Sequence, residues 1–168
     1  MTPILRPIAA LLLLAACAQP ERAVTAAQLS AAETGATELV EKWARSGSEG
    51  RWDDLIALYA DAPDFAWIEQ GENRYADHDA IAAGVRQARD ANMTVRTSAR
   101  NIVVTPLAPD AAAVRANVSI VFGDPAAGGF AFDGILTGVA IERDGRWMFL
   151  QGHLSSPPPP PASPPSGP

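Results

Sequence analysis

Asp133 is the carboxylate in this chain whose surroundings most favour chemistry. It alternates along one predicted strand face with Ile135, Thr137 and Val139, and a carboxyl group on an apolar face can act as a general acid or base. The alternative is a carboxylate at the exposed end of that strand, beside Gly134, where charges usually reach water. Both interpretations stay open on the sequence.

His153 is the second candidate for proton transfer. It lies near the end of the last predicted strand and shares one face with Trp147, Phe149, Gln151 and Ser155. An imidazole at that place could bind a ligand or act as a base. The alternative is a histidine that is hydrogen-bonded to neighbouring backbone or placed at a dimer edge.

Metal and cofactor chemistry has little support in the sequence. The other histidine, His78, stands between Asp77 and Asp79 at a predicted helix start, so we expect it on the surface. Two distant histidines do not give the spacing of a metal site, and the chain has no phosphate loop or nucleophile elbow. We therefore expect neither a metal nor another cofactor.

Three aromatic residues could line a binding pocket. Trp43 lies on a predicted helical stripe, Trp67 lies on a short predicted strand, and Tyr75 follows that strand. Large aromatic faces suit a small apolar or amphipathic ligand, although such stripes also form plain core. The predicted ligand-binding set is therefore Trp43, Trp67, Tyr75, Asp133 and His153.

The single cysteine, Cys17, follows a short apolar run that ends in Leu14-Ala15-Ala16. A positive residue before such a run and small residues after it are typical of a secretory signal. The pattern resembles the lipobox of bacterial lipoproteins, in which the chain is cut before the cysteine and the thiol is lipidated. The resemblance implies a signal peptide over residues 1–16, a lipidated Cys17 and a tether over residues 17–25.

Two other interpretations of this segment are weaker. The apolar run is too short for a transmembrane helix, which needs about 20 apolar residues. A secreted protein with a free thiol would carry a reactive group. Ala18 follows the cysteine, which by the same resemblance implies an outer-membrane lipoprotein that faces the periplasm.

Composition narrows the range of partners. The 168 residues carry a formal net charge of -6, and a nucleic-acid-binding surface needs a basic face, so we expect no nucleic acid. Residues 156–168 are Ser, Pro, Ala and Gly without charge, so they cannot bury apolar surface and are predicted to be disordered. A docking peptide for a proline-binding module is the alternative for this tail.

Apolar periodicity divides the chain between residues 26 and 155 into helices followed by strands. Two capping boxes compete for the start of the first helix, Thr25 with Gln28 and Ser30 with Glu33. A period of two begins after Met93 and continues through four segments separated by turns. The predicted elements are helices ending near 47, over 52–59 and from 77 or 79 onward, a turn over 70–73, and strands over 64–69, 94–105, 111–122, 129–142 and 146–153.

This order indicates an α+β fold with helices packed on an antiparallel sheet. The segments 50–55, 59–61, 64–69 and 145–155 resemble, in this order, SnoaL-like members of the nuclear-transport-factor-2-like superfamily. They are most similar to the branch that includes the association domain of calmodulin-dependent kinase. The resemblance implies one domain over residues 26–155, a curved sheet wrapped over helices into a cone with a pocket at its open end, and a homodimer formed through the sheet.

Enzymes of this superfamily allow the site residues to be compared. Its steroid isomerases use a tyrosine on the first helix, a carboxylate base near the end of the first strand, and a neutral aspartic acid on a late strand. By alignment these positions fall on Trp43, near Trp67 and near Thr137, and an indole cannot abstract a proton. The isomerase residues are therefore unmatched unless Glu69 or Asp133 replaces the base.

From these observations we expect a membrane-anchored periplasmic protein that binds a small, partly apolar molecule without turnover. The first alternative is a lyase or isomerase that uses Asp133 or His153 as the general acid or base. The second alternative is a dimerisation or assembly module whose pocket is filled by side chains. A carboxylate or histidine that opens into the pocket beside the tryptophans would favour an enzyme.

Overall fold

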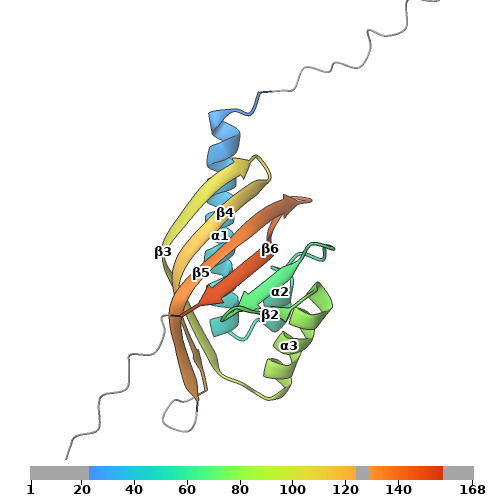
Figure 1. The fold of residues 1–168 in the computed structure, drawn as a ribbon, viewed down its shortest axis with the longest axis vertical. Coiled ribbons are helices and arrows are strands. Elements are labelled where there is room, and N and C mark those ends of the chain that lie inside the picture. The colour runs from blue at the N-terminus through green and yellow to red at the C-terminus, as the bar shows by residue number, and fades with distance from the viewer. Residues whose placement is uncertain (1–22, 124–128, 157–168) are drawn as a thin grey trace, which may run out of the picture.

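A curved six-stranded sheet wraps around a long helix (Figure 1). The computed structural model describes residues 23–123 and 129–156, so the predicted signal peptide, Cys17 and the tail beyond Ser156 lie outside it. In chain order the elements are α1 (Ala26–Ser48), α2 (Trp52–Ile56), β1 (Ala66–Glu69), β2 (Glu72–Tyr75), α3 (His78–Asp90), β3 (Val95–Ala108), β4 (Ala111–Phe122), β5 (Phe130–Arg143) and β6 (Arg146–Ser155).

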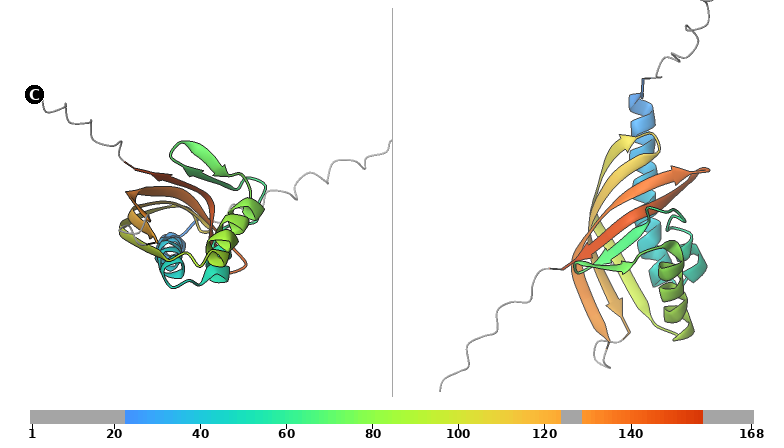
Figure 2. Two further views of the ribbon diagram at one scale, coloured as in Figure 1. Left: turned by 90° about the horizontal axis from the view of Figure 1, so that it is seen from below. Right: turned by 45° about the vertical axis from the view of Figure 1, so that its right-hand side comes forward.

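The predicted fold class, α+β with helices on a curved sheet, is confirmed. Figure 2 shows α1 lying inside the curve of the sheet, with α2 and α3 next to it. The strand order is β2-β1-β6-β5-β4-β3, and every neighbouring pair is antiparallel except β1 and β6, which run parallel. The sheet is therefore antiparallel with one parallel pair. A hairpin cannot connect two parallel strands, and the chain between β1 and β6 contains β2, α3, β3, β4 and β5.

The first of the two predicted capping boxes is the one that starts α1. The Thr25 hydroxyl accepts a hydrogen bond from the Gln28 backbone N–H at 3.2 Å, and the Gln28 side-chain oxygen accepts one from the Thr25 N–H at 2.9 Å. These bonds satisfy two N–H groups that the first turn of a helix otherwise leaves open. Ser30, the rival cap, therefore lies in the helix interior.

The apolar stripe of α1 packs into the sheet along most of its length. Its first member, Leu29, is only half-buried, because the start of α1 extends beyond the sheet (Figure 1). The apolar residues that follow at intervals of three or four along the same face are buried: Ala32, Ala36, Val40 and Trp43. None of the helices among the described residues is long and apolar enough to cross a membrane.

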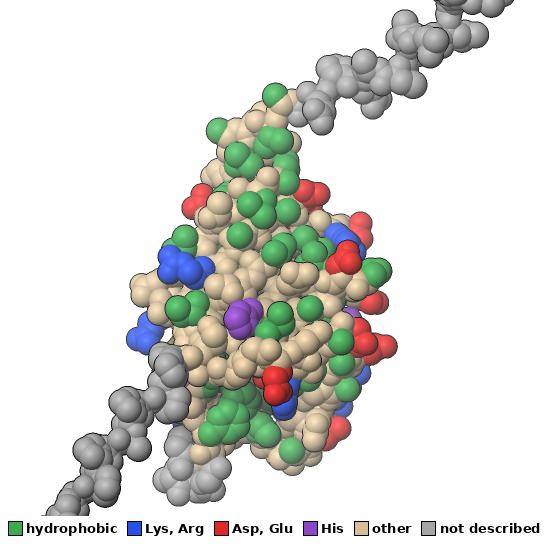
Figure 3. Space-filling view, viewed as in Figure 1, with side chains coloured by type: hydrophobic (Ala, Val, Ile, Leu, Met, Phe, Trp, Pro, Cys, Tyr) green, Lys and Arg blue, Asp and Glu red, His purple; other side chains and the backbone are tan. Residues whose placement is uncertain are grey.

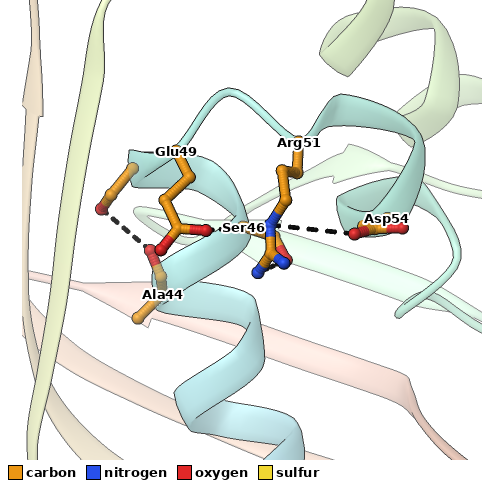
Figure 4. A network of polar contacts seen from close by, with 6 residues as sticks. Ala44, Ser46, Glu49, Arg51 and Asp54 are labelled. Carbon is orange, nitrogen blue, oxygen red and sulfur yellow. Dashed lines mark hydrogen bonds and ion pairs between the residues drawn. The ribbon is translucent and has the colours of Figure 1, made fainter.

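Arg51 fixes the turn between α1 and α2. Its side chain lies between Glu49 and Asp54 (Figure 4), with its Nε atom 3.0 Å from a Glu49 oxygen and 3.8 Å from an Asp54 oxygen. Its Nη2 atom donates to the hydroxyl of the fully buried Ser46 at 3.4 Å. This network connects the end of α1 to the start of α2, and α2 supplies Trp52 and Leu55 to the cavity described below.

The second helix is shorter than predicted. The sequence pattern predicts a helix over 52–59, but α2 ends at Ile56. The chain after it pairs with β6 instead, since the Ala60 N–H donates to the Phe149 carbonyl at 2.9 Å and the Phe149 N–H donates to the Leu58 carbonyl at 2.8 Å. Tertiary backbone pairing therefore takes these residues out of the helix and holds Tyr59 against β6.

Strand β2 occupies part of the segment that was predicted only as a turn. The turn itself is two residues long, Gln70 and Gly71, both with positive φ (53° and 86°). Such a pair matches the twist of the flanking strands and closes a tight hairpin. The sequence Glu72–Tyr75 is mostly polar and exposed, so it lacks the alternation that would have predicted a strand.

Candidate ligand-binding cavity

A cavity of about 730 Å³ lies between the inner face of the sheet and the three helices. Its wall is mostly apolar and comes from every helix and every strand in the described parts of the chain. The helices contribute side chains such as Trp43, Leu55 and Val85, and the sheet contributes Trp67, Ile120 and Leu154. The volume is within the range of about 300–1,000 Å³ that is usual for small-molecule sites.

Four aromatic rings form a packed group, and three of them line one side of this cavity: Trp43, Tyr59 and Trp67. The ring centroids of Trp43 and Trp67 are 6.1 Å apart, and Tyr59 meets Trp67 edge-on at 5.2 Å. Phe149, fully buried on β6, lies 5.6 Å from Trp67 and 6.3 Å from Trp43. Edge-on and tilted aromatic pairs of this kind are stabilising, so the rings of this wall support one another.

Both indole N–H groups of this aromatic wall are used within the site. The Nε1 atom of Trp43 donates to the Tyr59 hydroxyl at 2.9 Å, and the Nε1 atom of Trp67 donates to a carboxylate oxygen of Glu69 at 3.2 Å. An indole has a single donor and no acceptor. The two tryptophans therefore present only their apolar ring surfaces to a ligand.

Two glycines leave space that the side chains of Trp67 and Tyr75 occupy. A Cβ atom on Gly152 would lie 2.1 Å from Cζ3 of Trp67, and a Cβ atom on Gly84 would lie 2.8 Å from the Tyr75 hydroxyl. Both distances are shorter than real contacts of this kind allow. The lack of a side chain at these positions of β6 and α3 therefore allows Trp67 and Tyr75 to pack in the cavity wall.

The charged part of the cavity wall comes from the β1–β2 hairpin. The Nε atom of Arg74 lies 3.8 Å from Glu69, and its guanidinium carbon lies 6.0 Å from the centroid of the Tyr75 ring. The Gln70 side chain donates to the Ser156 hydroxyl at 2.8 Å. The Arg74 and Glu69 side chains are 59% and 35% exposed, so this polar edge lies where the cavity meets solvent.

The Tyr59 side chain is buried, unlike the side chains of Arg74 and Glu69. Burial raises the pKa of Tyr59 far above its ordinary value, and the nearby Glu69 carboxylate raises it further, while the hydrogen bond from Trp43 lowers it. The phenol is therefore neutral throughout the physiological range.

The structure brings three of the five predicted binding residues to the cavity. Trp43, Trp67 and Tyr75 all line it. Asp133 and His153 do not: Asp133 is exposed, and His153 is half-buried between Gly152 and Leu154, which are buried. Alternation along a strand explains this, since neighbouring side chains point to opposite faces, and both residues fall on the outer face of the sheet.

Two polar residues of the cavity wall that lie outside the predicted binding set, Tyr59 and Glu69, bear on the chemistry of the site. Tyr59 falls at the end of the segment that was predicted as a helix over 52–59. Glu69 lies two residues after Trp67 on the same strand, so the period of two already placed it on the same face. It is the one carboxylate that lines the cavity among the described residues, and no histidine of that part of the chain does so.

Known proteins with this architecture are distant in sequence. A hexachlorocyclohexane dehydrochlorinase from Novosphingobium barchaimii has a TM-score of 0.63 at 15% identity, covering 78% of this chain and 90% of its own. A proposed scytalone dehydratase from Novosphingobium aromaticivorans has a TM-score of 0.63 at 15% identity, with 72% and 80% covered. A proposed calcium/calmodulin-dependent protein kinase II association domain from Xanthomonas campestris has a TM-score of 0.60 at 20% identity, with 74% and 86% covered.

These similarities establish the fold, because identities this low carry no activity with them. No curated protein matches the chain by sequence. The family model of the SnoaL-like domain matches residues 36–159, which takes in the cavity and all six strands. The chain therefore belongs to the SnoaL-like domain family.

Proposed function

We propose that this domain binds a small, partly apolar molecule in the cavity and does not turn it over. The observation that carries the proposal is the cavity itself, about 730 Å³ of space beside a packed aromatic wall. An assembly module with a vestigial pocket would have that space filled by side chains. The unfilled volume therefore favours a binding site.

A lyase or isomerase is the second candidate, and Glu69 is the observation in its favour. Its carboxylate lines the cavity and accepts a hydrogen bond from Trp67, the position in which a general base would be expected. A dehydratase and a dehydrochlorinase are also among the proteins that share the fold. In this alternative Glu69, rather than Asp133 or His153, takes the proton.

Binding without turnover remains the better-supported candidate. Acid–base catalysis often uses a second titratable group whose pKa lies near the working pH. Besides Glu69, the described lining holds neither a histidine nor a second carboxylate, and its Tyr59 has a raised pKa that makes the phenol a weak acid. Both oxygens of Glu69 also have partners, since one accepts from Trp67 and the other faces Arg74 at 3.8 Å. Such a carboxylate is well placed to orient a polar group of a ligand.

We further propose that the domain is held at the outer membrane and faces the periplasm. The support is the sequence around Cys17, which resembles a lipidation site. The tether before Ala26 would then join the lipid anchor directly to the start of α1. In this arrangement the domain would collect its ligand from the periplasm.

A homodimer through the sheet is the proposed assembly. Figure 3 shows apolar side chains open on the outer face of the sheet, and three on β3 and β5 are well exposed: Val103 at 44%, Ile135 at 41% and Leu107 at 61%. A second copy would cover them. The similarity to a proposed association domain is in keeping with this assembly.

Native mass spectrometry of the protein purified from its own membrane tests the binding proposal. The expected result is a species heavier than the lipidated chain by the mass of a small molecule, which is released on unfolding. Incubation of the same sample with fresh membrane extract should restore that species after it is stripped. A chain that carries nothing before or after incubation would contradict the proposal.

A further inference from the structure

The hydroxyl group of Tyr59 has a hydrogen-bonding capacity that the protein does not use. Its oxygen accepts from the Trp43 indole at 2.9 Å. A phenol can also donate its own proton, and among the described residues the hydrogen bond of this hydroxyl group is the one that it accepts from Trp43. Tyr59 is 5% exposed and is one of the residues that line the cavity, so a molecule inside the cavity is the remaining candidate for an acceptor.

The position of this hydroxyl group is fixed by the fold. The backbone on both sides of Tyr59 is bonded to Phe149, and the ring meets Trp67 and Phe65 edge-on at 5.2 and 6.1 Å. Because Trp43 can only donate, it fixes the phenol oxygen as its acceptor. A donor held in this way needs no reorganisation when a ligand arrives, which favours binding.

We propose that the Tyr59 hydroxyl is the donor that recognises the ligand, and that the ligand is a neutral apolar molecule with a carbonyl-type oxygen acceptor. This inference rests on the proposed binding function and specifies its ligand class. A buried donor without an acceptor is costly, so a ligand that supplies one is selected over a hydrocarbon of the same shape. Tyr59 is thus a specificity-determining residue.

The charges around the site argue for a neutral acceptor rather than an anion. Glu69 is near enough to raise the pKa of Tyr59, and the same negative charge would repel an anionic ligand. Arg74 is mostly exposed and already faces Glu69, so it does not leave a free positive charge beside the phenol. Since the phenol keeps its proton, it can donate at any physiological pH.

Two probes of matched shape test this inference on the full-length protein. Acetylnaphthalene carries a C=O group where isopropenylnaphthalene, substituted at the same ring position, carries C=CH2. Titration calorimetry should show the wild type binding the ketone about tenfold more tightly, equivalent to ~1.4 kcal/mol. Tyr59→Phe keeps the ring and loses the hydroxyl, so the two probes should then bind with equal affinity.

Trp43→Phe provides a graded comparison. It keeps the Tyr59 hydroxyl but removes the indole donor that polarises it, so the preference for the ketone should fall without vanishing. Circular dichroism establishes that each variant is folded. If Tyr59→Phe does not fold, infrared spectroscopy of acetylnaphthalene bound to the wild type is the alternative measurement. A hydrogen bond from Tyr59 should lower the frequency of the carbonyl stretch from its value in hexane.

The outcomes separate this inference from the function on which it rests. Equal affinity of the wild type for both probes, or a ketone preference that survives in Tyr59→Phe, overturns the role of the hydroxyl while leaving the cavity as a binding site. An unshifted carbonyl stretch in the bound ketone overturns it as well. Failure of both probes to bind the wild type contradicts the binding function itself.

Discussion

The ring of Trp67 lies directly against the backbone of Gly152, so that a Cβ atom at residue 152 would be 2.1 Å from Cζ3 of the indole. The two residues face each other across the parallel pairing of β1 and β6. Trp67 is 2% exposed and belongs to both the core and the cavity wall. The absence of a side chain at Gly152 is therefore a condition for the aromatic wall.

Gly152→Ala should destabilise the domain because its methyl group takes the space of the Trp67 ring. Overpacking of this kind costs about 1–3 kcal/mol, and urea unfolding followed by fluorescence measures it. Gly47→Ala is the control and should cost less, since its new methyl group would meet Thr97 Oγ1 at 3.3 Å, a contact that a small shift of that side chain relieves, and alanine is favoured in a helix. Equal stability of Gly152→Ala and the wild type would show that Trp67 does not lie as described.

Stability at high pH should depend on Tyr59. Burial raises the pKa of Tyr59 above the ordinary value of 10.0, so above about pH 10 the unfolded chain loses this proton while the folded chain keeps it. Stability is therefore complete below that pH and falls as the pH rises, by about 1.4 kcal/mol per pH unit for this group. Tyr59→Phe should show a smaller fall in the free energy of unfolding between neutral and high pH. Identical pH profiles for the two proteins would refute a buried phenol.

Glu69→Gln separates a binding protein from an enzyme. The amide oxygen of glutamine can still accept the hydrogen bond from Trp67, but it cannot take a proton. In a binding protein the affinity for acetylnaphthalene should change by no more than about threefold, the scale of one exposed polar contact. If the native ligand of the wild-type protein is converted to a product and Glu69→Gln abolishes that conversion, the enzyme alternative replaces our proposal.

Cys17→Ser tests the membrane anchor. Only a thiol accepts the lipid in the modification that the sequence resembles, so the variant should lose incorporation of labelled lipid and partition into the aqueous phase of a detergent separation. Ala18→Ser, next to it, leaves the thiol in place and serves as the control. Unchanged partitioning and labelling of Cys17→Ser would exclude lipidation at this residue.

Much of the fold could be predicted from local patterns. The stripe that ends at Trp43 and the alternation around Trp67 placed both residues on inner faces, because helix and strand periods repeat over several residues. The parallel pairing of Trp67 with Gly152 could not be predicted in the same way, since it joins distant segments. The early end of α2 depends on Phe149, which also lies far along the chain.

The candidate site was harder to predict than the fold. Trp43, Trp67 and Tyr75 could be predicted as cavity residues because large aromatic side chains are usually buried when they lie on an apolar stripe. Asp133 and His153 were assigned to strand faces that also carry apolar residues. The alternation of side chains along a strand does not show which of its two faces points into the domain. The role of Tyr59 depends on a hydrogen bond across 16 positions of the chain, which no local pattern records.

The most direct test of the binding site is to fill the cavity with a larger side chain and to measure ligand affinity. Val85 lines the cavity from α3, whereas Ala83 is an exposed residue of the same helix outside the lining. Titration with acetylnaphthalene should show at least about tenfold weaker binding to Val85→Trp, because the indole occupies the space of the ligand. Ala83→Trp should bind like the wild type. Equal affinity of all three proteins for the probe would contradict the central claim that this cavity is the binding site.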